Sequence, residues 1–133
     1  MAIRAASCSC GQLRLKAEGE PVRVSICHCL ECQKRTGSVF AAQARFPRAA
    51  VTITGESRTW SRTGDDGGTA TFHFCATCSA IVYWTFREMP EFLAVPVGAF
   101  ADPAFPPPAV SVYENRRHPW TLALADLPLE HWS

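Results

Sequence analysis

Apolar and polar residues alternate along much of the chain, which is the pattern of strands that bury one face. Between Gln12 and Ala17, for example, apolar residues at 13, 15 and 17 are separated by polar ones. Similar short segments, rich in β-branched and aromatic residues, are bounded by glycine, proline or aspartate. The segments predicted as strands are 12–17, 22–26, 39–46, 51–54, 58–62, 69–74, 80–86 and 93–97.

Segments 80–86 and 93–97 are the most continuously apolar, so we expect them in the middle of a sheet. The glycine- and aspartate-rich segment 63–68 predicts a hairpin loop. Only residues 30–36 favour a helical turn, which the following Gly37-Ser38 ends. The pattern therefore predicts a mainly β fold of short strands with little helix.

The C-terminal part of the chain has a different pattern. Pro103 and the run 106–108 predict an extended, exposed stretch, because proline cannot donate to a strand ladder. Beyond them the tail carries large apolar side chains, which we expect to dock on the body. These side chains are Trp120, Leu122, Leu124, Leu127, Leu129 and Trp132.

Length and composition describe an ordinary globular chain. Its 133 residues are the size of one domain, predicted to span 1–133, and 47% of them are hydrophobic. No apolar run is long enough to cross a membrane and the start does not read as a secretion signal, so we expect a cytoplasmic protein without a membrane partner.

The formal net charge of +1 gives no general basic field, so no nucleic-acid partner is expected. With seven thiolates and two zinc ions the net charge would become about −2. Nothing in the sequence indicates an oligomeric state.

Seven cysteines fall into three clusters with metal-ligand spacing. In a reducing compartment such clusters bind metal more readily than they form disulfides. The clusters are C-x-C at Cys8 and Cys10, C-x-C-x-x-C at Cys27, Cys29 and Cys32, and C-x-x-C at Cys75 and Cys78.

A structural zinc takes four protein ligands, whereas a catalytic zinc keeps one position open. C-x-C and C-x-x-C are short turns that each present two sulfurs, and Gly11 permits the first turn. The outer four cysteines, hereafter the four-cysteine group, therefore predict a closed structural site. Cys27, Cys29 and Cys32, hereafter the cysteine triad, then form a site with one open position.

Two alternatives are left for the cysteine triad. A fourth ligand from His28, His73 or elsewhere would make both sites structural, although His28 lies between two ligands and is expected to point away. The triad could also be free of metal and form a transient disulfide.

The order of these motifs resembles a known family. C-x-C-G, then C-H-C-x-x-C-Q-K-R-T-G-S-x-F, then F-C-x-x-C are similar to the glutathione-dependent formaldehyde-activating enzyme (GFA) family, which includes the domain of centromere protein V. The resemblance covers nearly the whole chain. It implies a zinc-stabilised β-sheet fold like that of the Mss4 exchange chaperone, with one zinc on each cysteine group. Ser79 stands where the family commonly has glycine, and we expect altered loop geometry with zinc retained.

The resemblance also implies an activity. A zinc-dependent carbon–sulfur lyase of this kind would join glutathione and formaldehyde reversibly into S-hydroxymethylglutathione, or act on a related thiol adduct, with Cys27, Cys29 and Cys32 as the catalytic residues. Three thiolates weaken a zinc ion as a Lewis acid, which favours thiolate capture over carbonyl activation. The alternative is a non-catalytic, zinc-stabilised binding module of the same fold.

Glutathione carries two carboxylates, so cations are needed beside the open site. Lys34 and Arg35 follow Cys32 directly, and arginine can bind a carboxylate through two parallel hydrogen bonds. The Gly37 backbone and Ser38 could add donors. The same two cations are equally compatible with a solvated basic turn.

Overall fold

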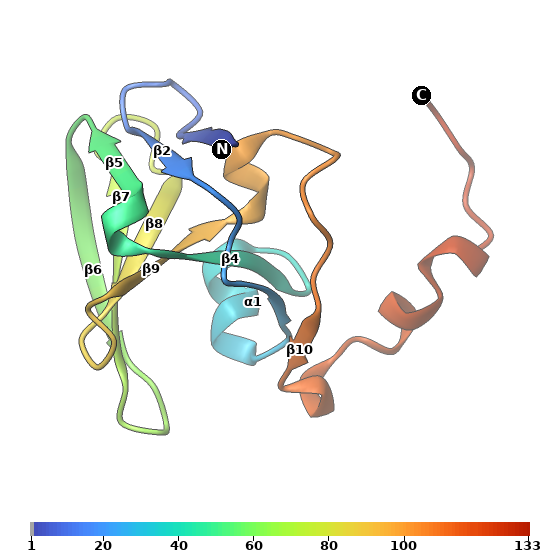
Figure 1. The fold of residues 1–133 in the computed structure, drawn as a ribbon. Coiled ribbons are helices and arrows are strands. Elements are labelled where there is room, and N and C mark those ends of the chain that lie inside the picture. The colour runs from blue at the N-terminus through green and yellow to red at the C-terminus, as the bar shows by residue number, and fades with distance from the viewer. Residues whose placement is uncertain (1) are drawn as a thin grey trace.

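The computed structural model describes residues 2–133, which form mainly β-strands (Figure 1). The predicted fold class is confirmed. The strands are β1 (Ile3–Ser7), β2 (Arg14–Glu18), β3 (Arg23–Cys27), β4 (Ala41–Pro47), β5 (Val51–Thr54), β6 (Ser57–Thr63), β7 (Thr69–Cys75), β8 (Ile81–Phe86), β9 (Phe92–Pro96) and β10 (Val110–Val112). The helical segments are α1 (Leu30–Thr36) and the 3-10 helices η1 (Arg48–Ala50), η2 (Val97–Phe100), η3 (Glu114–Arg116) and η4 (Pro119–Asp126).

The strands form two sheets. Three strands pair in the order β1-β2-β5, and seven pair in the order β10-β3-β4-β9-β8-β7-β6. β8 and β9 lie in the middle of the larger sheet, as their continuous apolar sequences predicted. β10 runs parallel to β3, and the other pairs are antiparallel.

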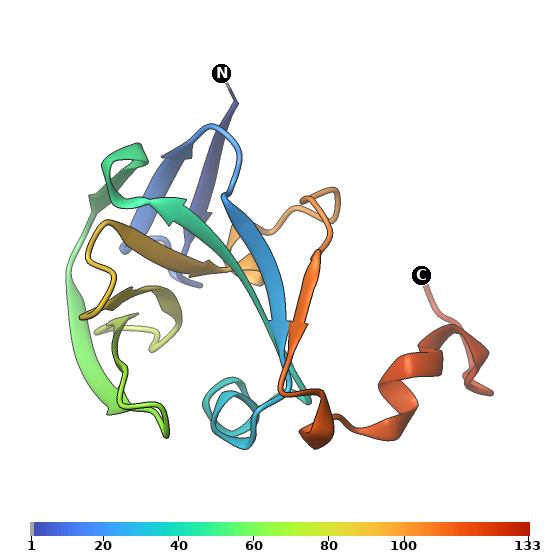
Figure 2. The ribbon, with the colours of Figure 1, turned by 60° about the horizontal axis from the view of Figure 1, so that its bottom comes forward.

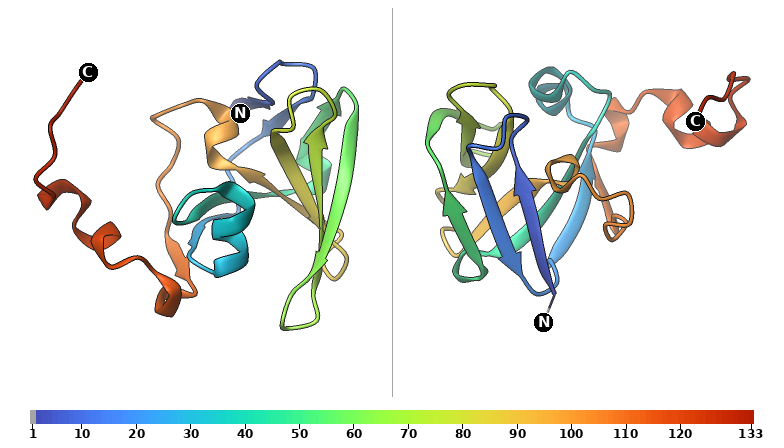
Figure 3. Two further views of the ribbon diagram at one scale, coloured as in Figure 1. Left: turned by 180° about the vertical axis from the view of Figure 1, so that it is seen from behind. Right: turned by 90° about the horizontal axis from the view of Figure 1, so that it is seen from above.

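The main core lies between the two sheets, which Figure 3 (right) shows one in front of the other. Leu15 of β2 is fully buried there, as are Phe46 of β4 and Leu93 of β9, which are directly opposite in register. Because side chains alternate along a strand, the neighbours of Phe46 and Leu93 point to the other face of the larger sheet. We call this other face the second face.

The second face carries a row of side chains that runs across the sheet. The register aligns Arg23 with Arg45, Arg45 with Ala94, Ala94 with Trp84, and Trp84 with Phe72. The sheet is curved, and α1 lies in the opening between its two edges (Figure 2). The short helix predicted at 30–36 is confirmed as α1, and it faces this row.

The expectation that the tail docks on the body is wrong. η4 and the residues after it extend away from the sheets (Figures 1 and 3). η4 is interrupted by non-helical dihedral angles at Ala123, so its apolar residues do not gather on one buried face. The exposed apolar side chains of the tail are Trp120, Leu122, Leu124, Leu129 and Trp132. Among residues 2–133, no helix has the length and apolar character needed to cross a membrane.

Candidate metal centres

The four-cysteine group joins two turns that are far apart in the sequence. Cys8 and Cys10 follow β1, Cys75 ends β7 and Cys78 lies in the turn after it, and all four sulfurs lie within 4.8 Å of one another. Cys10 Sγ is 3.6 Å from the sulfurs of both Cys8 and Cys75. A Zn–S bond of about 2.3 Å places tetrahedral sulfurs about 3.8 Å apart. The donors and their spacing therefore fit zinc.

Amide groups around this group stabilise the thiolate form. The backbone N–H groups of Thr77 and Cys78 donate to Cys75 Sγ, and the Gln12 side chain donates to the same sulfur at 3.1 Å. The backbone bond from Cys78 is the main reason that the pKa of Cys75 falls to about 5. Leu13 N–H donates likewise to Cys8 Sγ. Deprotonated sulfur is the form that zinc binds.

Tight turns place these sulfurs. Gly11 has a φ of 83°, the left-handed conformation expected of the first turn. Ser79 has a φ of 69°, so serine keeps the backbone conformation that glycine would adopt after Cys78. Its N–H donates to Cys75 O. The altered loop geometry expected at Ser79 is therefore not seen, because serine adopts a conformation typical of glycine and the turn around the cysteines is closed.

The cysteine triad is formed where β3 meets α1. Cys27 ends β3, Cys29 caps the N-terminus of α1, and Cys32 lies in its first turn, donating its N–H to Cys29 Sγ at 3.2 Å. The three sulfurs lie within 4.8 Å of one another. A hydrogen bond with Cys27 lowers the pKa of Cys32 to about 5, and the same bond raises the pKa of Cys27. Cys27 and Cys32 are buried, whereas Cys29 is half-buried and gives access from solvent.

Within residues 2–133, no fourth cysteine, histidine or carboxylate joins the triad. His28 is buried and turned toward Ser111, with Nε2 3.2 Å from Oγ. His73 bonds Ser57 and stacks on Tyr83. Neither histidine considered as a fourth ligand is therefore placed with the triad. None of the seven cysteines forms a disulfide.

The two predicted substrate-binding cations occupy different surroundings. Lys34 is exposed and forms an ion pair with Glu31 at 2.8 Å. Arg35 instead places Nη2 3.7 Å from Cys32 Sγ. Its guanidinium lies over the rings of Phe72 and Trp84, 4.7 and 4.6 Å from their centroids. Of the two, Arg35 reaches both the triad and the second face.

Gly37 and Ser38, the other predicted substrate contacts, form the end of α1. Gly37 has a φ of 70° and donates its N–H to Gln33 O. Ser38 is exposed and donates its backbone N–H to Thr36 Oγ1. These two backbone donors thus bond within the turn, and a role of either residue in substrate binding stays a prediction.

Sequence reasoning missed two glutamines that hold the sites together. Gln33 donates to the carbonyls of His28 and Arg116 and bonds His118 through Oε1. Gln12, besides its bond to Cys75 Sγ, exchanges two hydrogen bonds with the backbone of Glu56. Their partners lie up to 85 residues away along the chain, so no local pattern indicates them.

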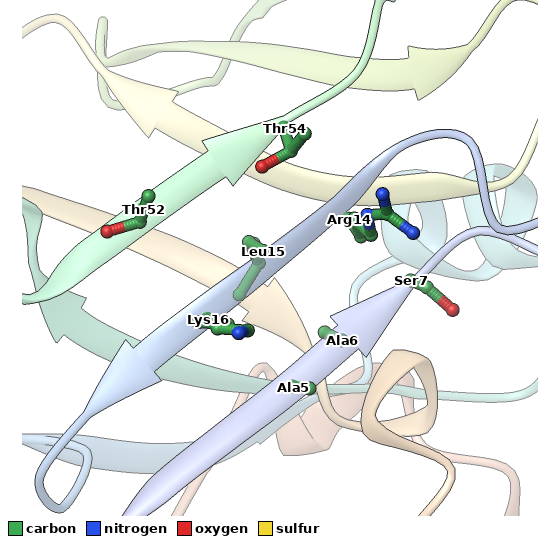
Figure 4. A pocket seen from close by; sticks show the side chains of 8 residues that line it. All are labelled: Ala5, Ala6, Ser7, Arg14, Leu15, Lys16, Thr52 and Thr54. Atoms are coloured by element: carbon green, nitrogen blue, oxygen red, sulfur yellow. The ribbon is translucent and has the colours of Figure 1, made fainter.

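A hollow of about 480 Å³ lies on the three-stranded sheet, lined by residues of β1, β2 and β5 and by no residue of the triad (Figure 4). No buried polar atom without a hydrogen-bond partner points into it from the described residues. Its basic and hydroxyl side chains belong to an ordinary solvated sheet face. The lining residues are Ala5, Ala6, Ser7, Arg14, Leu15, Lys16, Thr52 and Thr54.

The chain is similar in sequence to one protein family and in fold to a solved structure. The sequence model of the family described as glutathione-dependent formaldehyde-activating enzyme matches residues 3–116. A crystal structure of a Rhodobacter sphaeroides protein, determined by Northeast Structural Genomics, is similar in fold, with a TM-score of 0.56 and 22% sequence identity over 71% of this chain and 85% of that chain. No curated protein matches the chain.

Proposed function

Because the chain belongs to the glutathione-dependent formaldehyde-activating enzyme family, we propose that it joins a small thiol, glutathione, to formaldehyde and catalyses the reverse cleavage. The observation that supports this proposal is the cysteine triad, whose three clustered sulfurs have no fourth protein ligand among residues 2–133. A purely structural zinc site is closed by four ligands. The triad thus has the ligand count of a site that accepts a substrate.

The proposed reaction conserves oxidation state and needs no further reactant. The thiol sulfur bonds to the carbonyl carbon, the C=O π pair moves to oxygen, and oxygen takes the proton that the thiol loses. The product is S-hydroxymethylglutathione, and breaking its carbon–sulfur bond is the lyase direction. Cys27, Cys29 and Cys32 would hold the zinc ion, which when bound would lower the pKa of an added thiol and so favour its ionised form.

Arg35 is the residue of the chain best placed to assist. Its guanidinium, 3.7 Å from Cys32 Sγ, offsets part of the negative charge of the clustered thiolates. Stacking on Phe72 and Trp84 holds it in that position. The half-buried Cys29 leaves the triad open to a small molecule. The four-cysteine group has the separate task of joining two distant turns through a structural ion.

The test compares zinc content, folding and turnover of Cys27→Ser and Cys75→Ser with the parent chain. The two cysteine groups predict two zinc ions in the parent. Cys27→Ser is expected to stay folded, lose one zinc and lose formation of S-hydroxymethylglutathione, whereas Cys75→Ser is expected to unfold. If Cys27→Ser unfolds as severely as Cys75→Ser, both sites are structural and the proposal fails in favour of a binding module.

A further inference from the structure

Two arginines face each other on the second face without an acidic partner. Arg23 of β3 and Arg45 of β4 are directly opposite in register, and among the described residues neither forms an ion pair. Like charges directly opposite on neighbouring strands are destabilising. Burial and the adjacent Arg23 lower the pKa of Arg45. An anion bound between them would relieve this repulsion.

The two arginines line a hollow of about 80 Å³, whose other polar walls are Ser25 and Gln43. Arg23 Nε and Gln43 Oε1 are buried there without a hydrogen-bond partner. Gln43 Nε2 donates to Ser25 Oγ, and rotation of the amide would exchange its donor and acceptor. A water molecule takes about 30 Å³, so the hollow holds a group of a few atoms, the size of a carboxylate.

An apolar wall completes the hollow. Trp84 and Phe86 line it together with Ala94, and the Arg45 guanidinium lies over the Phe86 ring at 5.4 Å. A wall of this kind lowers the local dielectric, so hydrogen bonds between a guanidinium and a bound carboxylate are stronger than in water.

The hollow and the cysteine triad share the second face. Arg23, Ser25 and Cys27 alternate along β3 and therefore point to the same side. At a rise of about 3.4 Å per residue, Arg23 lies about 14 Å along the strand from Cys27. Arg35 connects the hollow and the triad. Its guanidinium lies over Trp84, which lines the hollow, and its Nη2 contacts Cys32 Sγ. A short peptide at about 3.3–3.6 Å per residue covers most of this distance.

We propose that Arg23 and Arg45, assisted by Gln43 and Ser25, form the subsite that binds a carboxylate of the thiol substrate. This inference rests on the proposed function, since it assigns the hollow to the acidic end of the molecule whose sulfur reaches the triad. Arg23 and Arg45 then select an acidic thiol over a neutral one.

The test measures dissociation constants for glutathione and for its diethyl ester, in which both carboxylates are blocked and the amino group is kept, using the zinc-loaded full-length chain and calorimetry. The parent is expected to bind the free acid at least about tenfold tighter than the ester, the effect of charge-assisted hydrogen bonds. Arg23→Gln and Arg45→Gln should each remove most of this preference. Arg14→Gln, the same change of charge at the hollow on the three-stranded sheet (Figure 4), should keep it.

A thiol-free dicarboxylate, glutarate, separates the subsite from the proposed reaction. If the parent and the three glutamine variants all prefer the free acid equally, the proposed subsite is wrong, and the proposed reaction is not affected. Glutarate binding that depends on Arg23 and Arg45, without binding of glutathione, supports the subsite and removes glutathione as substrate. If neither molecule binds in a manner that depends on the two arginines, the subsite is wrong.

Folding of the variants is not expected to obscure the result. Removing one of two facing cations should leave the melting temperature of the free protein unchanged or raised, because the repulsion is lost. Should Arg45→Gln unfold, Arg45→Lys retains the charge without the planar fork. That variant is expected to keep part of the preference for the free acid, and full preference in it would show that the planar fork of Arg45 does not contact the carboxylate.

Discussion

At the residue scale, the sulfurs are held by backbone conformations and amide donors that depend on single side chains. Ser79 adopts a left-handed conformation with a φ of 69° while its N–H bonds Cys75 O. Gln12 donates to the sulfur of Cys75. Such contacts explain how two turns from distant parts of the chain keep four sulfurs in position.

The strain at Ser79 makes Ser79→Gly a stabilising change. Glycine adopts the left-handed conformation without the steric cost that serine has there. Its greater conformational entropy in the unfolded chain offsets part of this advantage, so the free energy of unfolding should rise by about 0.5–1 kcal/mol. Urea denaturation of the zinc-loaded protein measures it. Ser38→Gly, at an exposed serine without a positive φ, is the control and should gain nothing; a loss of stability in Ser79→Gly would contradict the argument.

Glu88 gives a prediction of pH dependence. Its carboxylate accepts a hydrogen bond from Thr69 N–H at the start of β7 and another from Arg87 Nε, and the bond from Thr69 is the main reason that the pKa of Glu88 is lowered. A carboxyl group whose pKa is lower in the folded state stabilises the fold at pH values above its pKa in the unfolded chain, which is about 4.3. This stabilisation is lost as the pH falls through the lower pKa of the folded state.

Glu88→Gln should therefore unfold at lower urea than the parent at pH 7, and the difference should shrink below about pH 4. Comparing the two proteins at each pH cancels any loss of zinc in acid that they share. Glu91→Gln, which removes another exposed carboxylate, is the control. A difference that stays constant from pH 7 to pH 3 would show that the ionised carboxylate is not the source.

At the element scale, local alternation indicated most strands and not their partners. The segments at 51–54 and 69–74 became β5 and β7 almost unchanged. Two strands were missed: β1 is a five-residue segment containing only one large apolar side chain, and β10 is a three-residue strand after a proline run. β10 forms only because it lies parallel to β3, a contact between distant parts of the chain that no local pattern encodes.

The turn after β5 packs directly against the loop that carries the first two cysteines. Gly55 has a φ of 102°, and a Cβ placed there would lie 1.9 Å from the carbonyl oxygen of Gln12. Gly55→Ala therefore forces the Gln12 backbone to move, and we expect a loss of about 3 kcal/mol or more.

The control for Gly55→Ala is Gly67→Ala, whose φ is 86° and whose Cβ would meet no atom within 4 Å. It should lose only the conformational penalty of about 1–2 kcal/mol. Urea denaturation measures both losses, and zinc analysis is expected to show weaker metal retention in Gly55→Ala alone. Equal losses of unfolding free energy in the two variants would mean that the close approach of Gly55 to Gln12 does not contribute to the cost of Gly55→Ala.

At the scale of the whole molecule, the two sheets bury a core on one side of the larger sheet and leave the second face to the cysteine triad and Arg35. Cysteine spacing was enough to predict which sulfurs group together, because each short turn presents its sulfurs to one point. The facing pair Arg23 and Arg45 was not predictable, because the two are 22 positions apart and meet only through strand register. The tail was misjudged because apolar content alone does not say whether a segment finds a surface to cover.

Deletion of residues 122–133 tests the position of the tail. Its large apolar side chains are exposed, so the melting temperature of the shortened chain should change by no more than about 2 °C. The alternative, in which the tail covers part of the body, predicts a fall of more than about 5 °C. Differential scanning calorimetry on the two zinc-loaded chains distinguishes these results.

The most direct test of the central claim is the rate of exchange between free formaldehyde and S-hydroxymethylglutathione, measured by NMR at equilibrium. The zinc-loaded protein should raise this rate in proportion to its concentration, well above an equal concentration of zinc salt. Cys29→Ser, which alters the triad and leaves the four-cysteine group intact, should abolish the increase while the protein stays folded. An exchange rate that the parent does not raise, or that Cys29→Ser raises equally, would contradict the assignment of the triad as the reactive site.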